Sequence, residues 1–181
     1  MTATKSRLTE EELMSLPDDG LKHEYVDGEV TDVPTGGVHE DIGAILTILL
    51  GPHALRVGRI YGSGLGCWMR SGNVRSPDVS VVRSERLPGG RSGKGFFQGA
   101  PDLCVEIISP SENRRDMERK VREYFESGAQ QVWHVLPKTR EVIVFGAAGT
   151  QTRLGPEDTL TGGDVVPGFE CRVADLFEGA A

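Results

Sequence analysis

Two short stretches of the chain are almost wholly apolar, and they lie on either side of a charged segment. The first stretch covers residues 103–108, the second covers residues 131–136, and Gly128 stands just before the second. Apolar runs of this length are typical of strands buried on both faces, and a glycine commonly follows the last turn of a helix. The pattern therefore predicts a strand, a helix from Asn113 as its N-cap to about Ser127, and a second strand.

Earlier in the chain the apolar residues follow other periods. Between Ile42 and Leu50 they recur at helical intervals, which predicts a helix with a wide buried face, and Pro52 predicts that this helix ends or kinks there. The Asp27-Gly28 pair favours a tight turn and predicts a hairpin over residues 22–30. Thr9 and Glu12 have the spacing of a capping box at the start of a short helix.

The remaining elements are shorter. Residues 84–99 are rich in glycine, arginine and serine and predict a mobile surface loop, and residues 173–177 predict a final short helix. Further strands are expected at residues 56–61, 65–69, 76–82, 141–145, 152–154, 158–160 and 169–172. Strands mixed with a few helices predict an α/β (α+β) fold, and a length of 181 residues predicts one domain over residues 1–181.

Composition narrows the classes of function. The formal net charge of −7 argues against a broadly basic coat for nucleic acid, although a bound metal ion would reverse the sign of the field at an acidic site. The three cysteines are too far apart for a zinc site or a disulfide framework. The N-terminus lacks the apolar segment of a signal peptide, and no apolar run is long enough to span a bilayer. We therefore expect a soluble, cytoplasmic protein with no membrane partner.

Acidic residues within or beside the predicted strands are the first candidates for chemistry. Glu106 interrupts an apolar strand, Asp78 opens another, and Glu24 lies in the predicted hairpin. If the two strands are neighbours, Asp78 and Glu106 can reach one point and hold Mg²⁺, which prefers oxygen ligands and can activate water. Each residue also has a plainer explanation, because Glu106 can form a structural ion pair and Asp78 can be a solvated or capping residue.

The predicted charged helix contributes a possible cation. Asp116, Lys120 and Tyr124 share one face, beside the apolar seam, so Lys120 can bury its stem and present its ammonium to the acids. The alternative is an ordinary surface lysine on a solvated helix, and the glutamates interleaved along the helix support that alternative. The histidines show no metal-ligand spacing and are expected to be structural, although His39 could line a cleft.

An ordered series of short motifs resembles the Uma2 family of restriction endonuclease-like proteins, within the PD-(D/E)XK nuclease superfamily. The resemblance runs from about residue 8 to residue 177. It is carried by Glu24 with the Tyr-Val-Asp-Gly that follows, His39, residues 77–82, residues 101–111, Lys120 with Tyr124, Gly128 and residues 132–135. It implies a restriction endonuclease-like mixed β-sheet flanked by helices, with β-hairpin additions.

The resemblance also implies a site and an activity. Asp78 and Glu106 match the two metal-ligand acids, and the carbonyl of Ile107 would be a backbone ligand to Mg²⁺ or Mn²⁺. Glu24 matches an earlier acid of the family. The superfamily usually places a lysine two residues after the second acid, where this chain has Ile108, and Lys120 on the next helix matches the displaced lysine.

The four residues Glu24, Asp78, Glu106 and Lys120 are thus expected to meet in one cleft and to hydrolyse phosphodiester bonds in DNA, with the protein acting as a homodimer. Basic residues of the loop, namely Arg83, Arg86, Arg91 and Lys94, could contact phosphate or could simply be polar loop residues. Two alternatives remain open. One is a catalytically inactive nuclease fold that only binds a partner, and the other is a carboxylate-pair hydrolase of sugars that needs no metal.

Overall fold

A six-stranded mixed sheet forms the centre of the protein in the computed structural model, which describes residues 7–17, 22–33, 36–90, 93–109 and 112–178. β8 and β9 are parallel, and every other neighbouring pair of this sheet is antiparallel. In spatial order the strands are β11 (Gln151–Leu154), β10 (Glu141–Gly146), β9 (Gln131–Leu136), β8 (Leu103–Ile107), β6 (Val79–Arg83) and β3 (Gly58–Gly62).

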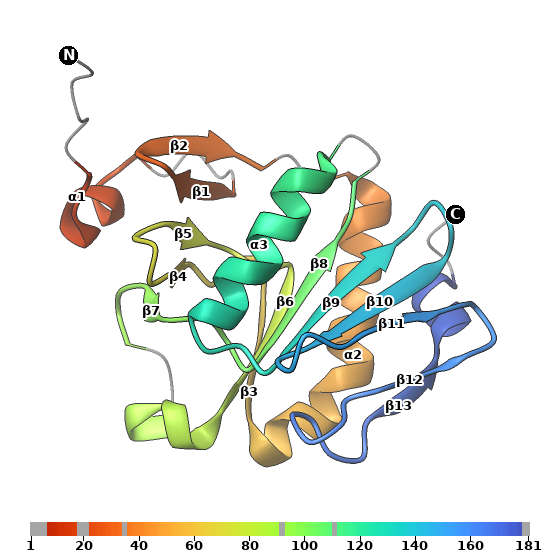
Figure 1. The fold of residues 1–181 in the computed structure, drawn as a ribbon. Helices are drawn as coiled ribbons and strands as arrows, with labels where there is room; N and C mark the ends of the chain where they lie inside the picture. Colours follow the sequence, from red (N-terminus) through yellow and green to blue (C-terminus); the bar gives the residue numbers. More distant parts are fainter. Residues whose placement is uncertain (1–6, 18–21, 34–35, 91–92, 110–111, 179–181) are drawn as a thin grey trace.

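Two helices cover opposite faces of this sheet, α2 (Gly37–Val57) behind it and α3 (Arg114–Glu126) in front of it in Figure 1. Side chains alternate along β8, so Val105 packs into the core on the α2 side while Cys104 packs into the core on the α3 side. Glu106 shares the α3 face with Cys104, which explains how an acid can stand in a buried strand. It faces a helix that carries cations.

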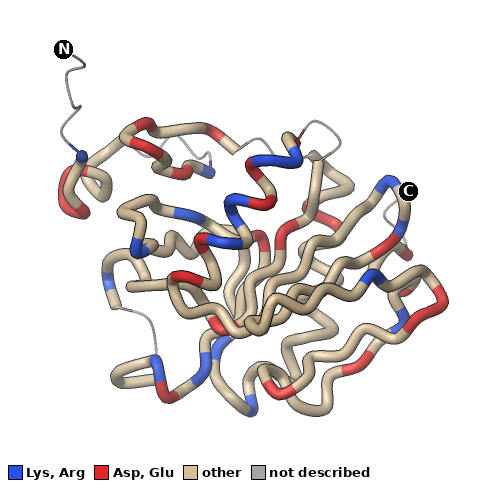
Figure 2. The backbone as a smooth tube through the Cα atoms, viewed as in Figure 1, with Lys and Arg blue, Asp and Glu red and all other residues tan. Residues whose placement is uncertain are grey.

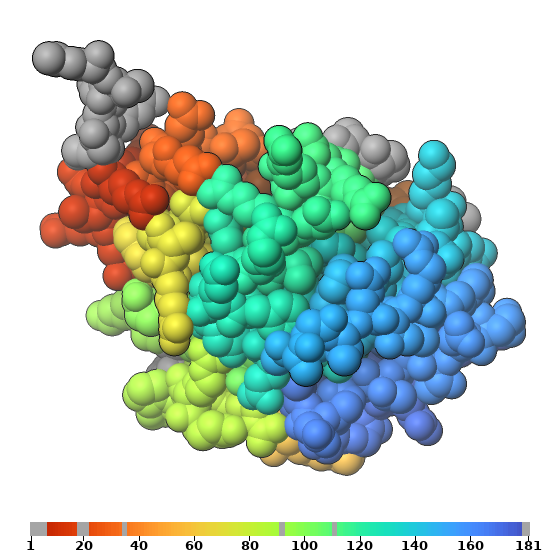
Figure 3. Space-filling view, in the orientation of Figure 1, coloured from red at the N-terminus to blue at the C-terminus, as the bar shows by residue number. Residues whose placement is uncertain are grey.

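A second, smaller sheet lies beside α3. Its strands run in the order β2-β1-β5-β4-β7, and the short helix α1 (Glu10–Met14) packs near them. Figure 3 shows α3 seated between these N-terminal elements and strands β10 and β11. The bounds are β1 (His23–Val26), β2 (Glu29–Asp32), β4 (Cys67–Trp68), β5 (Val74–Arg75) and β7 (Phe97–Gln98).

The C-terminal part of the described chain closes the α2 side. β12 (Thr159–Thr161) and β13 (Glu170–Arg172) form a hairpin, and the 3-10 helix η3 (Val173–Phe177) contacts α2. Among the described residues, no helix combines the length and the apolar character needed to cross a membrane.

Many predicted elements are confirmed. The strand–helix–strand unit is present as β8, α3 and β9, with the Asn113 side chain accepting a hydrogen bond from the Arg115 N–H at 2.8 Å. Gly128 has a φ of +106°, the conformation that a glycine after a helix supplies. The hairpin at Asp27-Gly28 and the capping box at the start of α1 are also present.

The region around Pro52 differs from the prediction. α2 continues past Pro52 to Val57, so the strand expected from residue 56 begins at Gly58 instead. Pro52 is exposed, and so is Ile48, whose carbonyl loses its partner, so the missing hydrogen bond costs less than it would in the core. The helix ends at Val57 instead, and Gly58 follows it as the C-cap. A Cβ at Gly58 would lie 1.9 Å from the Val82 carbonyl oxygen, so this position requires glycine.

The segment expected to be a mobile loop contains defined structure. It forms the 3-10 helices η1 (Ser84–Arg86) and η2 (Pro88–Gly90) and the strand β7. Arg91 lies outside the described residues, as does the end of the 101–111 motif at residues 110–111.

Candidate active site

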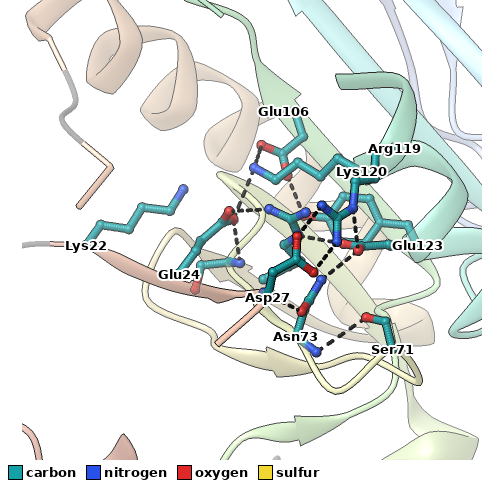
Figure 4. A network of polar contacts seen from close by, with 12 residues as sticks. Lys22, Glu24, Asp27, Ser71, Asn73, Glu106, Arg119, Lys120 and Glu123 are labelled. Atoms are coloured by element: carbon teal, nitrogen blue, oxygen red, sulfur yellow. Dashed lines mark hydrogen bonds and ion pairs between the residues drawn. The ribbon is translucent and has the colours of Figure 1, made fainter. Parts of the chain in front are cut away.

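Lys120 lies between two buried carboxylates. Its Nζ is 3.0 Å from Glu24 Oε1 and 2.9 Å from Glu106 Oε2 (Figure 4). The other oxygen of Glu106 accepts a hydrogen bond from the Tyr124 hydroxyl, one helical turn beyond Lys120. The four side chains come from three elements, β1, β8 and α3, so the cluster exists only where the small sheet, the central sheet and the helix meet.

Arg75 extends this cluster inward. It donates from Nη1 to Glu24 at 2.9 Å and from Nε to Glu123 at 2.7 Å. Glu24 also accepts from the Ser76 N–H at 3.0 Å, and Glu123 accepts from Asn73 Nδ2 at 2.7 Å. All five residues are buried, so the charges are paired and hydrogen-bonded as buried charges must be.

The network reaches the surface through the hairpin turn. Both terminal nitrogens of Arg119 donate to Asp27 at 2.6 Å, in the two-pronged geometry that an arginine fork favours. Arg119 also contacts Glu123 at 3.2 Å. Figure 2 shows basic and acidic residues following one another along α3, and these contacts show that the pattern is more than a solvated face. Glu123 is buried, so it does not support the alternative of a solvated helix face, for which the interleaved glutamates were cited.

Asp78 forms a second group on the other side of Glu106. Its Oδ1 accepts from Lys22 Nζ at 2.6 Å, and its Oδ2 lies 3.0 Å from His39 Nε2 and accepts from the Ile107 N–H at 2.8 Å. Asp78 and Ile107 line a cleft of about 380 Å³ beside α2. The remaining lining residues are His39, Glu40, Gly43, Ala44, Thr47, Ile48, Gly62 and Ser63.

Burial and neighbouring charges act on these carboxyls in opposite directions. Burial alone would raise the pKa of Glu24, but the charges of Lys120 and Arg75 outweigh it and lower this pKa. For Asp78 burial is likewise outweighed, here by His39 and Lys22, and the pKa is lowered. For Glu106 burial prevails over the attraction of Lys120, and repulsion from Asp78 adds to it, so the pKa of Glu106 is raised.

The basic partners respond in the opposite sense. Burial would lower the pKa of Lys120, but the charges of Glu106 and Glu24 raise it further, so the ammonium keeps its proton. The pKa of His39 is raised, because the hydrogen bond and the charge of Asp78 together exceed the effect of burial. The site therefore combines three buried acids, Glu24, Asp78 and Glu106, with basic partners that lie within hydrogen-bonding distance of them.

The chemistry of the donors fits a hard divalent cation at Asp78 and Glu106. Carboxylate oxygens are the ligands that Mg²⁺ prefers, and the repulsion between these two acids is what a cation between them would relieve. One cation, the Lys22 ammonium, already lies 2.6 Å from Asp78 Oδ1. Within the described ranges, no group of three or more His, Cys, Asp or Glu side chains is arranged to hold a metal, so the fit rests on these two acids.

The structure brings three of the four predicted site residues into direct contact: Glu24, Glu106 and Lys120. Asp78 lies in the adjoining group and is linked to the first through Ile107, the residue after Glu106. Lys120 points toward the two acids in Figure 4, and its side chain is 12% exposed. The role of the Ile107 carbonyl as a ligand to the metal remains a prediction.

Two cations of the site were missed by the sequence analysis. Lys22 precedes β1 and Arg75 closes β5, and neither has a spacing that links it to the acids. The available signal was the position of Arg75, since an arginine next to apolar Val74 and three residues before Asp78 needs an acidic partner when it is buried. His39, expected to be structural or to line a cleft, does line the cleft and contacts Asp78.

The mixed sheet with its helices and two acid clusters has the architecture of a restriction endonuclease-like protein, and comparison with known proteins agrees. The model of the Uma2 family, described as "Putative restriction endonuclease", matches residues 10–174, so the chain belongs to the Uma2 family. This membership supports a nuclease function in general terms.

A solved structure shows the same fold. It is the crystal structure of a putative nuclease belonging to DUF820 from Anabaena variabilis ATCC 29413, with a TM-score of 0.80 and 22% sequence identity. The match covers 96% of this chain and 99% of that chain. A search of curated proteins gave no match.

Proposed function

We propose that the protein is an endonuclease that depends on a divalent metal, Mg²⁺ or Mn²⁺, and hydrolyses phosphodiester bonds in DNA. The observation that carries the proposal is the Lys120 ammonium, whose side chain is only 12% exposed and which is held between Glu24 and Glu106. Asp78 lines the cleft that adjoins this cluster. A lysine that is largely removed from solvent, charged and aimed at two acids is costly as a purely structural feature, since an apolar pair of similar size would often be as stable.

The residues of the chain have distinct roles in this proposal. Asp78 and Glu106 would hold the metal, which when bound polarises the phosphodiester and activates water. Lys120 Nζ is an ammonium donor and can stabilise the negative charge that develops on phosphate. Tyr124 fixes one oxygen of Glu106, and His39 fixes one oxygen of Asp78, so both carboxylates are oriented before substrate binds.

The proposed partners are DNA and a second copy of the chain, and the proposed compartment is the cytoplasm. Two arginines of the loop predicted to contact phosphate have partners within the protein. Arg83 is paired with Glu85 at 2.7 Å, and Arg86 lies 3.3 Å from Asp102 and stacks over Phe97. Lys94 is exposed.

Cleavage of supercoiled plasmid with Mg²⁺ or Mn²⁺ tests the proposal, with chelator as the blank. Lys120→Met is expected to lower the rate by about a hundredfold or more, as for the loss of one donor that stabilises developing charge. Glu106→Gln is expected to abolish the dependence of the rate on metal concentration. Arg114→Met is the matched control, because Arg114 is on the same helix with its side chain 88% exposed, and its rate should not change.

Equal traces of cleavage by the wild type and by both site variants would refute an endonuclease at these residues.

A second function is supported by one observation. In the described residues every oxygen of Asp78 and Glu106 already has a donor within the protein, as in a site built for stability. Carboxylates that are fully hydrogen-bonded within the protein are what we expect of a nuclease fold that binds DNA without cutting it. Retardation of DNA in a gel, unchanged by Lys120→Met and without any cleavage, would favour that function over the endonuclease.

A further inference from the structure

The outer face of α2 is apolar and exposed. Ile48 is 71% exposed, Leu55 is 57% exposed and Val38 is 44% exposed, while the opposite face of the helix is fully buried against the central sheet. A helix that is apolar all round is typically buried all round. The sheet covers one side of α2, so the other side lacks a cover within the described part of this chain.

The exposed residues form a seam with a regular spacing. Steps of three and four residues alternate along it, as at the contact of paired helices. The seam consists of the exposed residues Val38, Asp41, Ile48, Pro52 and Leu55 and the half-buried Ile45. Ile48 is at its centre and is its most exposed member, so we take it as the point about which two such seams would meet.

The charges of the seam are complementary to those of a second, antiparallel copy. Asp41 lies seven residues before Ile48 and Arg56 lies eight residues after it. At about 1.5 Å of rise per residue these positions are about 10.5 Å and about 12 Å from the centre, so an antiparallel partner brings its Arg56 beside Asp41. Both side chains are exposed, and within the described ranges neither makes an ion pair.

The sizes of the residues are complementary as well. In the same arrangement Ile45 lies opposite Pro52 of the second copy, and Ala44 lies opposite its Gly51. Apart from its chain neighbours and the nearby backbone of α2, no atom lies within 4 Å of the position that a Cβ on Gly51 would occupy, so that flank is open. A small residue on each side lets two helices approach closely.

We propose that the outer face of α2 binds the same face of a second copy of this chain, with the two helices antiparallel about a two-fold axis through Ile48. Two-fold contacts of this kind are self-complementary, as these pairs are. The pairing does not depend on the proposed nuclease activity.

The pairing also has a consequence for the cleft. Ala44 and Ile48 line the Asp78 cleft, which therefore borders one flank of the seam. A two-fold axis perpendicular to both helices keeps each flank on its own side of the pair. The clefts of the two copies thus open on the same side of the dimer.

Sedimentation velocity over a concentration series tests the proposal. The wild type is expected to sediment as a species of twice the chain mass of 19.6 kDa. Ile48→Asp should weaken association by at least about a hundredfold, because two apolar side chains are lost from the centre of the contact. Val30→Asp, on the exposed hairpin strand β2, is the matched control and should leave association unchanged.

Charge exchange gives the sharper test. Asp41→Arg alone and Arg56→Asp alone should each weaken association by about tenfold, while an equal mixture of the two variants should associate as well as the wild type. Circular dichroism should show that all variants are folded, since each site is exposed. A wild type that stays monomeric, or a mixture no better than its parts, would overturn the proposal, as would dissociation by Val30→Asp with no effect of Ile48→Asp.

Discussion

Replacing Arg75 by methionine removes the cation that joins two buried acids. Arg75 is buried and donates at 2.9 Å to Glu24 and at 2.7 Å to Glu123. Methionine keeps most of the apolar stem, so the change isolates the loss of charge and hydrogen bonds from the loss of packing. The two carboxylates would then be left in the interior with fewer partners.

The size of the effect follows from the partners that remain. Removing one member of a buried ion pair typically costs about 3–5 kcal/mol. Glu24 keeps Lys120 at 3.0 Å, and Glu123 keeps Asn73 at 2.7 Å, so neither acid is fully stranded. We therefore expect the free energy of unfolding to fall by about 3 kcal/mol, the lower end of that range.

Urea denaturation at neutral pH measures this loss. The matched control is Arg153→Met, which breaks an arginine–glutamate pair of 2.6 Å whose arginine is 54% exposed, and it should cost no more than about 0.5 kcal/mol. Adding Glu123→Gln to Arg75→Met neutralises one stranded acid, so the double variant should be more stable than the sum of the single losses by about 1–3 kcal/mol. A loss below about 1 kcal/mol for Arg75→Met, or strict additivity, would refute the reasoning.

Three further predictions concern other parts of the core. Burial lowers the pKa of His134 to about 4, so the folded protein binds this proton later than the unfolded chain. Stability should therefore fall by about 3 kcal/mol as pH drops from 6.5 to 4, and His134→Gln should reduce that loss in urea titrations at several pH values. Tyr124→Phe should cost about 1–3 kcal/mol, because it strands an oxygen of buried Glu106, as thermal denaturation would show. Gly58→Ala should cost about 3 kcal/mol in the same assay, since its methyl group would collide with the Val82 carbonyl; an unchanged melting temperature would contradict this.

The sequence pattern could predict the strand–helix–strand unit because each element carries its own period and its own end signal. The alternation along β8 and the amphipathic α3 place Glu106 and Lys120 toward each other without further information. Asp78 and Glu24 were candidates because they lie within or beside predicted strands, and the family resemblance gave them their roles, since no local signal separates them from ordinary surface acids. In the structure Glu24 contacts Lys120, which also contacts Glu106, so the three residues form one cluster.

The partners of these acids could not be predicted, because they depend on tertiary register. Tyr25 pairs with Val74 across the small sheet, and this single pairing places Glu24 beside Arg75. A shift of one residue in the pairing of these strands would leave the Glu24 and Arg75 side chains on opposite faces of the sheet. Pro52 is a similar case, since whether it ends a helix depends on which side of α2 faces solvent.

The acid cluster draws on parts of the chain that are far apart. Arg119 and Asp27 are separated by 92 residues, and Arg75 is separated by 51 residues from Glu24 and by 48 from Glu123. Contacts of such long range require the entropy of closing large loops to be overcome, so they cannot form until the separate segments of the chain have met. A nascent or partly folded chain thus has no assembled site, and any cleavage by this protein would report that folding is complete.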